Sequence, residues 1–319
     1  MRKIVLGRTN AKVSAISLGT WAYGGANMTG KFAVGWGGQE DKESKEALLA
    51  AWENGINHWD TADVYGEGKS EKIIGNMWSD VPRNKIFLAT KVGWDKKPNS
   101  YWYEPLHMIE NLERSLNNLK TSYVDLVYLH HCNFGKNGEH FNDAIKVLND
   151  FKKEGKTRFI GLSDWSNKNI LKYIKMCNPD VIQPYRNVMD DNYVSSGLSS
   201  YVNQNNIGVC FFSPIKHGLL TGKYNKPTKF DHGDHRSNIK EFTDQEILDK
   251  MKLNKSLLEE RFSYHENPVM HGIIDALLND CSNACVLLGQ RNTNQVKIAS
   301  TLGKIMTDKN SKWVKSIYK

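Results

Sequence analysis

The chain has 319 residues, of which 39% are hydrophobic and 24% are charged, proportions that are typical of a folded globular protein. They exclude intrinsic disorder, a collagen-like fibre and a small disulfide-stapled scaffold. The net charge is +8, so nucleic-acid binding has to be considered. No stretch approaches the roughly 18 apolar residues of a membrane span, and the N-terminus has no apolar signal core. We therefore expect a cytoplasmic protein without a membrane partner.

Short apolar runs alternate with longer amphipathic segments along the chain. In chain order the predicted strands are 15–18, 57–59, 86–89, 124–129, 157–162, 181–182, 207–212 and 285–288. The clearest predicted helices are 44–54, 106–119, 143–154, 167–176 and 199–205. For the first of these helices, Asp41 is a possible N-cap and Gly55 a C-terminal stop.

Strands that alternate with helices and are apolar on both faces predict a parallel sheet with right-handed crossovers. A single (β/α)8 TIM barrel over residues 1–319 fits this pattern best. A doubly wound open sheet is the alternative, but it normally carries G-x-G-x-x-G after its first strand, and the residues after Leu18 do not supply it. Residues 1–13 are expected to form a β-hairpin that caps the bottom of the barrel.

Polar side chains follow three consecutive predicted strands where each strand ends. Asp60 and Tyr65 follow the second strand, and Lys91 and His130 follow the next two. In a barrel these ends meet on one rim, which is where active sites of this fold lie. Each side chain alone could be structural, as a turn cap, a packed phenol, a solvated ammonium or a buried imidazole. Together they indicate a catalytic site.

Three other patterns resemble metal-binding or phosphate-binding sites, but we interpret none of them as such a site. The five cysteines have no C-x-x-C spacing, and we expect them to be reduced and mostly structural. Residues 66–70 end like a phosphate-binding loop, but Asp63 occupies the position of its first glycine. Residues 231–235 contain two aspartates and two histidines, which we interpret as part of a mobile polar loop. We therefore predict no metal site.

The positive charge is concentrated at the C-terminus. Five lysines and one aspartate lie in residues 304–319, which we interpret as a solvated basic tail. Because this tail carries half of the net charge, we expect no nucleic-acid partner. The remaining basic residues are expected to serve one anionic small molecule in a cleft.

Eight motifs occur in an order that resembles the aldo-keto reductases, over residues 5–303. They are LGTW at 18–21, DTADVYG at 60–66, ATK at 89–91, GLSD at 161–164, Gln183, FSP at 212–214, GLLTGKY at 218–224 and GQRN at 289–292. Residues 21–25, 36–38 and 218–236 are similar to the bacterial general-stress branch of that family and to its potassium-channel β-subunit relatives. The resemblance implies NAD(P)H-dependent reduction of aldehydes or ketones to alcohols.

The resemblance also implies a role for each polar residue on the rim. Tyr65 would donate a proton to the substrate oxygen, and Lys91 would lower the pKa of that phenol. Asp60 would hold the Lys91 ammonium, while His130 would orient the substrate. The adjacent His131 points to another side of the strand or into the next loop and is left out.

Cofactor contacts are implied around the barrel mouth. Phe212 would stack on the nicotinamide, and Arg291 would bind a 2′-phosphate, which favours NADPH while leaving NADH possible. The sequence departs from the family at Asp164, where asparagine is usual, and at Ile298 and Ala299, where the adenine is normally contacted. The complete implied set is Gly19, Thr20, Trp21, Ser163, Asp164, Gln183, Phe212, Ser213, Pro214, Leu219, Gly222, Lys223, Arg236, Gly289, Arg291 and Gln295.

Residues 217–239 contain three glycines and four basic residues, and we expect this segment to close over the cofactor as a lid. An aromatic-lined mouth is suggested by Trp21, Trp36, Trp94 and Trp165. Two other functions stay open: an NADPH-binding, redox-sensing regulatory subunit with slow chemistry, and a barrel with non-redox chemistry such as isomerisation. The carbonyl substrate and the oligomeric state do not follow from the sequence.

Overall fold

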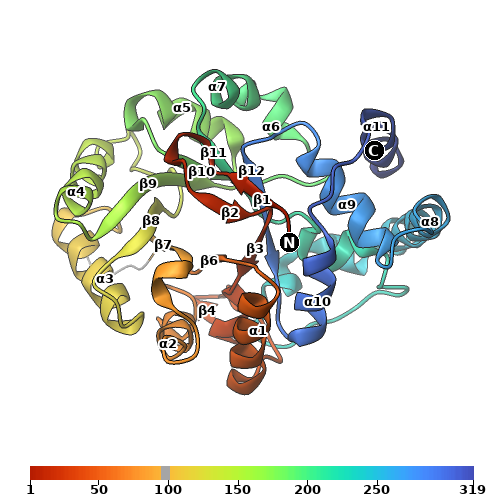
Figure 1. The fold of residues 1–319 in the computed structure, drawn as a ribbon, viewed down its shortest axis with the longest axis horizontal. Coiled ribbons are helices and arrows are strands. Elements are labelled where there is room, and N and C mark those ends of the chain that lie inside the picture. Colours follow the sequence, from red (N-terminus) through yellow and green to blue (C-terminus); the bar gives the residue numbers. More distant parts are fainter. Residues whose placement is uncertain (95–100) are drawn as a thin grey trace.

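Eight parallel strands close into a barrel in the computed structural model, which describes residues 1–94 and 101–319 (Figure 1). Neighbours in the barrel follow the order of the chain, and the last strand closes the ring by pairing with the first. The barrel strands are β3 (Ile16–Gly19), β6 (His58–Asp60), β7 (Phe87–Val92), β8 (Val124–Leu129), β9 (Thr157–Asp164), β10 (Val181–Pro184), β11 (Gly208–Phe211) and β12 (Ala284–Gly289). All eight predicted strands are present, and the (β/α)8 fold is confirmed.

Helices form a ring outside the barrel (Figure 1). They are α1 (Asp41–Glu53), α2 (Lys69–Gly75), α3 (Pro105–Asn118), α4 (Phe141–Lys153), α5 (Asn167–Cys177), α6 (Asn192–Ser195), α7 (Leu198–Gln204), α8 (Gln245–Arg261), α9 (Pro268–Leu278), α10 (Thr293–Thr301) and α11 (Asp308–Tyr318). In α4, Ala144, Val147, Leu148 and Phe151 are buried at helical spacing, so one apolar stripe faces the strands.

Among the described residues, no helix has both the length and the apolar character needed to cross a bilayer.

The N-terminal hairpin closes the bottom of the barrel, as predicted. Strands β1 (Lys3–Val5) and β2 (Lys12–Ser14) pair antiparallel and cross the near end of the barrel in Figure 1. Leu6 is fully buried. Gly7 has a φ of +49°, and a Cβ placed there would lie 2.2 Å from the backbone nitrogen of Gly208 at the start of β11. The hairpin therefore approaches the barrel as closely as a glycine allows.

Two local predictions were wrong. Asp41 is the first residue of α1 rather than its N-cap; Glu40 takes that position, and its side chain makes no capping hydrogen bond. The basic C-terminal segment is not a solvated tail, because most of it forms α11, with Val314 and Tyr318 buried. Lys315 pairs with Asp280 at 2.9 Å, so part of its positive charge is neutralised against the barrel.

Candidate active site

The four predicted catalytic side chains meet at the C-terminal end of the barrel. Asp60 ends β6, Lys91 lies near the end of β7, and His130 directly follows β8. The Lys91 ammonium donates hydrogen bonds to Asp60 Oδ1 at 2.5 Å and to the Tyr65 hydroxyl at 3.2 Å. It also donates to the Thr61 carbonyl at 2.8 Å. The His130 and Tyr65 rings lie edge to face with centroids 5.9 Å apart. One buried ammonium thus connects the carboxylate to the phenol.

Burial sets the protonation of these groups. Desolvation raises the pKa of the Tyr65 hydroxyl, and the Lys91 charge offsets only part of that rise. The sequence predicts that Lys91 lowers the Tyr65 pKa below its ordinary value. That prediction is wrong in its net direction, because the complete burial of the phenol raises the pKa by more than Lys91 lowers it. Desolvation lowers the pKa of Lys91, but the Asp60 carboxylate outweighs it and the net shift is upward. Desolvation and the Lys91 charge hold the pKa of His130 well below its usual value. At neutral pH the phenol is protonated and the imidazole is neutral.

Asp60 is held from two sides. Its Oδ1 faces Lys91, and its Oδ2 accepts a hydrogen bond of 2.7 Å from Nε2 of Gln183 on β10. All three side chains are buried. The resemblance implies only a cofactor contact for Gln183, whereas the structure shows it fixing the carboxylate that orients the ammonium. The sequence carries no local signal for this contact, because the two residues lie on strands far apart in the chain.

A cleft of about 840 Å³ opens at this rim of the barrel. Asp60, Tyr65 and His130 line it, and Lys91 lies behind them. Most of the residues implied as cofactor contacts line the same cleft: Gly19, Thr20, Trp21, Ser163, Gln183, Phe212, Ser213, Pro214, Lys223, Arg236, Gly289, Arg291 and Gln295. Barrel closure brings them together, because they follow strands that are separated along the chain.

Three implied cofactor residues do not line the cleft. Asp164 ends β9, and its carboxylate oxygens accept the backbone N–H groups of Cys132 and Ser166, both at 2.6 Å. Leu219 is fully buried in the core, and Gly222 packs against the backbone of α8. These residues hold the loops around the cleft, and their positions do not support direct cofactor contact.

Aromatic side chains form one wall of the cleft. The four tryptophans suggested by the sequence, Trp21, Trp36, Trp94 and Trp165, all line it. His217 and His235, which the sequence analysis did not assign, join this wall, with ring centroids 5.8 and 5.0 Å from that of Trp21. Burial lowers the pKa of His217 to about 3, so this ring is neutral at physiological pH. The wall therefore presents mainly uncharged aromatic surface to a ligand.

Positive charge lies beside this wall: Lys223, Arg236 and Arg291 line the same cleft, and the Arg236 guanidinium lies 4.4 Å from the Trp36 ring centroid. Arg236 is oriented by Asp234 through an ion pair of 2.6 Å. Asp234 also accepts a hydrogen bond of 3.0 Å from the Gly37 N–H. Arg291 donates hydrogen bonds to the backbone carbonyls of Gly37 and Gly38. The guanidinium groups are therefore fixed before any ligand binds, which lowers the entropy cost of anion binding.

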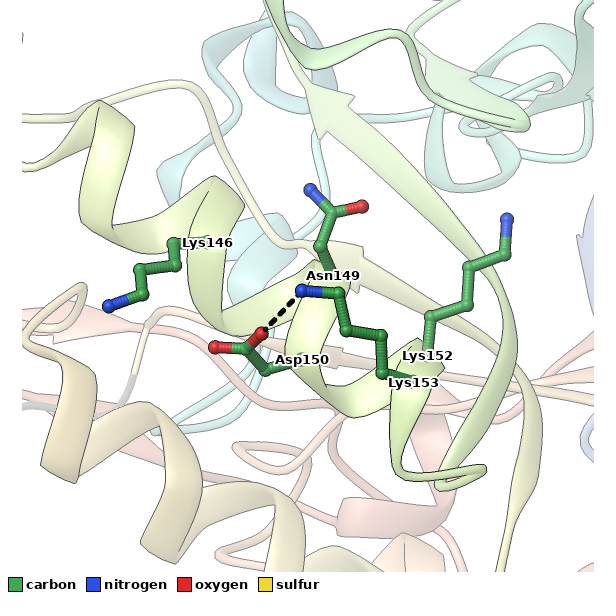
Figure 2. Close-up of a pocket in the computed structure, with 5 residues that line it drawn as sticks. All are labelled: Lys146, Asn149, Asp150, Lys152 and Lys153. Atoms are coloured by element: carbon green, nitrogen blue, oxygen red, sulfur yellow. Dashed lines mark hydrogen bonds and ion pairs between the residues drawn. The ribbon is translucent and has the colours of Figure 1, made fainter.

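A second hollow lies on the outer face of α4 (Figure 2). Lys153 pairs with Asp150 at 3.2 Å, while Lys146 points away from this pair. All the side chains that line the hollow come from one helix, at a surface where solvated lysines are ordinary. We interpret it as part of the solvated helix surface.

The sequence matches a known family over most of its length. The model of the aldo/keto reductase family matches residues 15–311, a range that includes all eight barrel strands. The chain belongs to the aldo/keto reductase family. This assignment confirms the family resemblance and the oxidoreductase class expected from the sequence.

Relatives in this family include enzymes and channel subunits. An aldo-keto reductase of Bacillus subtilis is 29% identical over 92% of this chain and 86% of its own length. The NADH-specific methylglyoxal reductase of Escherichia coli is 32% identical over 70% of each chain. A probable voltage-gated potassium channel subunit beta of rice is 31% identical over 69% of this chain and 66% of its own. The solved structure of a glycerol dehydrogenase from Gluconobacter oxydans has a TM-score of 0.81 and 27% identity, covering 99% of this chain and 94% of that one.

The cleft of this aldo/keto reductase fits a nicotinamide dinucleotide. A Cβ placed on Gly289 would meet no atom within 4 Å, so the backbone at the end of β12 borders open space that a ligand can occupy. Ser163 and Gln183 supply polar groups near the catalytic cluster, and the arginines supply charge suited to phosphates. Of the two residues at the positions where the family normally contacts adenine, Ile298 lines the cleft and Ala299 is buried.

Proposed function

We propose that this aldo/keto reductase reduces aldehydes or ketones to alcohols with a reduced nicotinamide cofactor, and that Tyr65 donates the proton. The observation that carries the proposal is the Lys91 ammonium, which contacts both Asp60 and the Tyr65 hydroxyl beside the cleft. The cofactor, when bound, supplies a hydride to the carbonyl carbon. A screen of carbonyl substrates, followed by the absorbance of the reduced nicotinamide, tests this activity.

The chain's own groups account for the proton transfer. Tyr65 is protonated at neutral pH and can donate its proton to the substrate oxygen. The phenolate that remains is stabilised by the ammonium of Lys91, which already lies 3.2 Å away. His130 is neutral and can hydrogen-bond the same substrate oxygen, which holds it near the phenol. The aromatic wall excludes water and favours substrates with an apolar portion.

A regulatory subunit that senses the nicotinamide redox state through slow chemistry is the second candidate. The similarity to a probable potassium channel subunit beta supports it. The complete set of Asp60, Tyr65, Lys91 and His130 supports turnover instead. The same substrate screen separates the two, because a sensor binds the dinucleotide tightly but reduces every carbonyl slowly.

We propose NADPH as the preferred cofactor, with Arg291 binding its 2′-phosphate. Arg291→Ala should weaken NADPH binding by about 2 kcal/mol, or about thirtyfold, and leave NADH binding nearly unchanged. Dissociation constants for both cofactors, measured by titration of the protein fluorescence, check this. Lys153→Ala on the outer face of α4 is the control and should change neither constant. An equal loss for both cofactors would show that Arg291 does not discriminate them, as in an NADH-specific enzyme.

We also propose that residues 217–239 act as a lid over the cofactor. The segment is anchored to the neighbouring turn by the Gly37 N–H, which donates to Asp234, and by Arg236, whose guanidinium lies 4.4 Å from the Trp36 ring centroid. Within the segment, Arg236 pairs with Asp234 and packs against Phe230, with the guanidinium 4.3 Å from the ring centroid. Lys223 and Arg236 also line the cleft, so a bound phosphate would add contacts that favour the closed segment.

Amide hydrogen exchange tests the lid directly. We expect amides in 217–239 to exchange more slowly when NADPH is saturating, because phosphate contacts oppose local opening. Amides of α4, which lies outside the barrel, should not change and serve as the internal control. Equal protection of 217–239 with and without NADPH would mean that the segment is a permanently packed loop.

A further inference from the structure

A cluster of sulfur and nitrogen ligands lies inside the barrel, apart from the cleft. Cys210 on β11 and Cys285 on β12 are direct partners in the parallel strand register. His58 on β6 lies opposite them, with Nδ1 3.4 Å from Cys285 Sγ. The two sulfurs and a ring nitrogen of His58 all lie within 4.8 Å of one another, and all three residues are fully buried.

The distances resemble those of a tetrahedral metal site. Zinc lies about 2.3 Å from a sulfur ligand and about 2.0 Å from a nitrogen ligand. In a tetrahedral site, a sulfur and a nitrogen ligand are therefore about 3.5 Å apart, and two sulfur ligands are about 3.8 Å apart. The observed distance of 3.4 Å between Cys285 Sγ and His58 Nδ1 agrees with the first value. The Cys210 sulfur lies within 4.8 Å of both other ligand atoms, so a shift of its side chain by about 1 Å brings it to tetrahedral spacing.

The orientation of the His58 ring identifies the nitrogen that would bind the cation, because Nδ1 faces Cys285 Sγ at 3.4 Å. Nε2 of His58 is buried and has no hydrogen-bond partner among the residues that the structure describes. Nε2 points away from Nδ1 in the same ring, so it would not contact a cation bound at Nδ1. Ser17 Oγ on β3 lies 4.0 Å from Cys285 Sγ, so a hydroxyl group borders the cluster.

We propose that His58, Cys210 and Cys285 form a structural site for a divalent thiophilic cation, zinc above all. Two thiolates and a neutral imidazole balance a charge of +2, so the loaded site adds no net charge to the barrel interior. A monovalent ion would leave a net negative charge there. The site goes beyond the proposed function, because none of its residues lines the catalytic cleft.

Metal binding requires both cysteines as thiolates, so each thiol releases its proton when the cation enters. In the structure Cys285 Sγ donates to the Val209 carbonyl at 3.5 Å. This contact is replaced by the bond to the cation when the site is loaded.

Metal analysis of the full chain tests the proposal. We expect protein produced with added zinc, then dialysed against metal-free buffer under reducing conditions, to retain about one zinc ion per chain. Cys285→Ala and Cys210→Ala should each lose this zinc. Cys177→Ala removes a buried cysteine of α5 that lies outside the cluster, and it should retain the metal. Loss of zinc from the control as well, or retention by both cluster variants, would overturn the proposal.

A measurement on the unmodified chain covers the case in which the variants do not fold. Production with cobalt in place of zinc should give the intense near-ultraviolet absorption of thiolate-to-cobalt charge transfer. Cobalt-loaded protein without this band, or purified protein essentially free of zinc, would refute the site whatever the enzymatic activity is.

Discussion

Tyr65→Phe should reduce kcat for carbonyl reduction by about 10²–10⁴-fold, the usual contribution of a general acid. The substitution removes only the hydroxyl oxygen that lies 3.2 Å from the Lys91 ammonium and keeps the ring that packs against Trp21 and His130. Cofactor affinity should therefore stay within about twofold, because the proton donor contributes to the chemical step rather than to binding. Steady-state kinetics and a cofactor titration on the same preparation measure both quantities.

A matched control distinguishes proton donation from damage to the cleft. Tyr23 is also buried, and its hydroxyl donates to the Gln290 carbonyl at 2.8 Å, outside the catalytic cluster. Tyr23→Phe should cost stability, by about 1 kcal/mol for the lost hydrogen bond, with little effect on kcat. Undiminished reduction by Tyr65→Phe would assign the proton donor to another group.

The barrel was predictable from the sequence because its strands are buried on both faces. Such strands appear as continuous apolar runs, and polar residues directly after them mark the catalytic rim. Asp60, Lys91 and His130 all occupy such positions, so their convergence follows from strand order alone. The hairpin was predictable from its place in the chain: residues 1–13 come directly before the first barrel strand, so they lie at the end of the barrel where that strand begins.

Contacts between distant strands were not predictable in the same way. The hydrogen bond of Gln183 to Asp60 and the cluster of His58, Cys210 and Cys285 depend on which interior side chains share a layer. Cysteine spacing along the chain gives no sign of that cluster, so the expectation of no metal site rested on local motifs only. A prediction of these contacts requires the strand register, because a shift of one residue turns a side chain out of the barrel.

The C-terminal segment shows a different kind of error. Its lysines indicate a solvated tail when they are counted alone. Val314 and Tyr318, however, recur at helical spacing and are buried in α11. Charge and apolar periodicity describe opposite faces of this helix, and only the periodicity indicates whether the segment packs.

Lys91→Met should abolish most of the reductase activity, with a loss of about 10²-fold or more in kcat. Methionine keeps an unbranched side chain of similar length but cannot stabilise the phenolate that Tyr65 leaves after proton transfer. Removal of the ammonium also takes away the charge that partly offsets the burial-driven rise in the Tyr65 pKa, so this pKa should rise further. In the reverse reaction, where Tyr65 must accept a proton, the pH at which activity appears should therefore move upward.

Stability separates the structural and catalytic parts of this effect. Lys91→Met leaves the Asp60 carboxylate buried with only Gln183 as a side-chain partner among the hydrogen bonds of the described residues, and an unpaired buried charge costs about 3–5 kcal/mol. The double variant Asp60→Asn with Lys91→Met removes that charge and should recover much of the loss in urea unfolding. Its kcat should stay low, because no cation faces Tyr65. Recovery of activity together with stability would mean that Lys91 serves the fold alone, and that the phenol donates its proton without help from a cation.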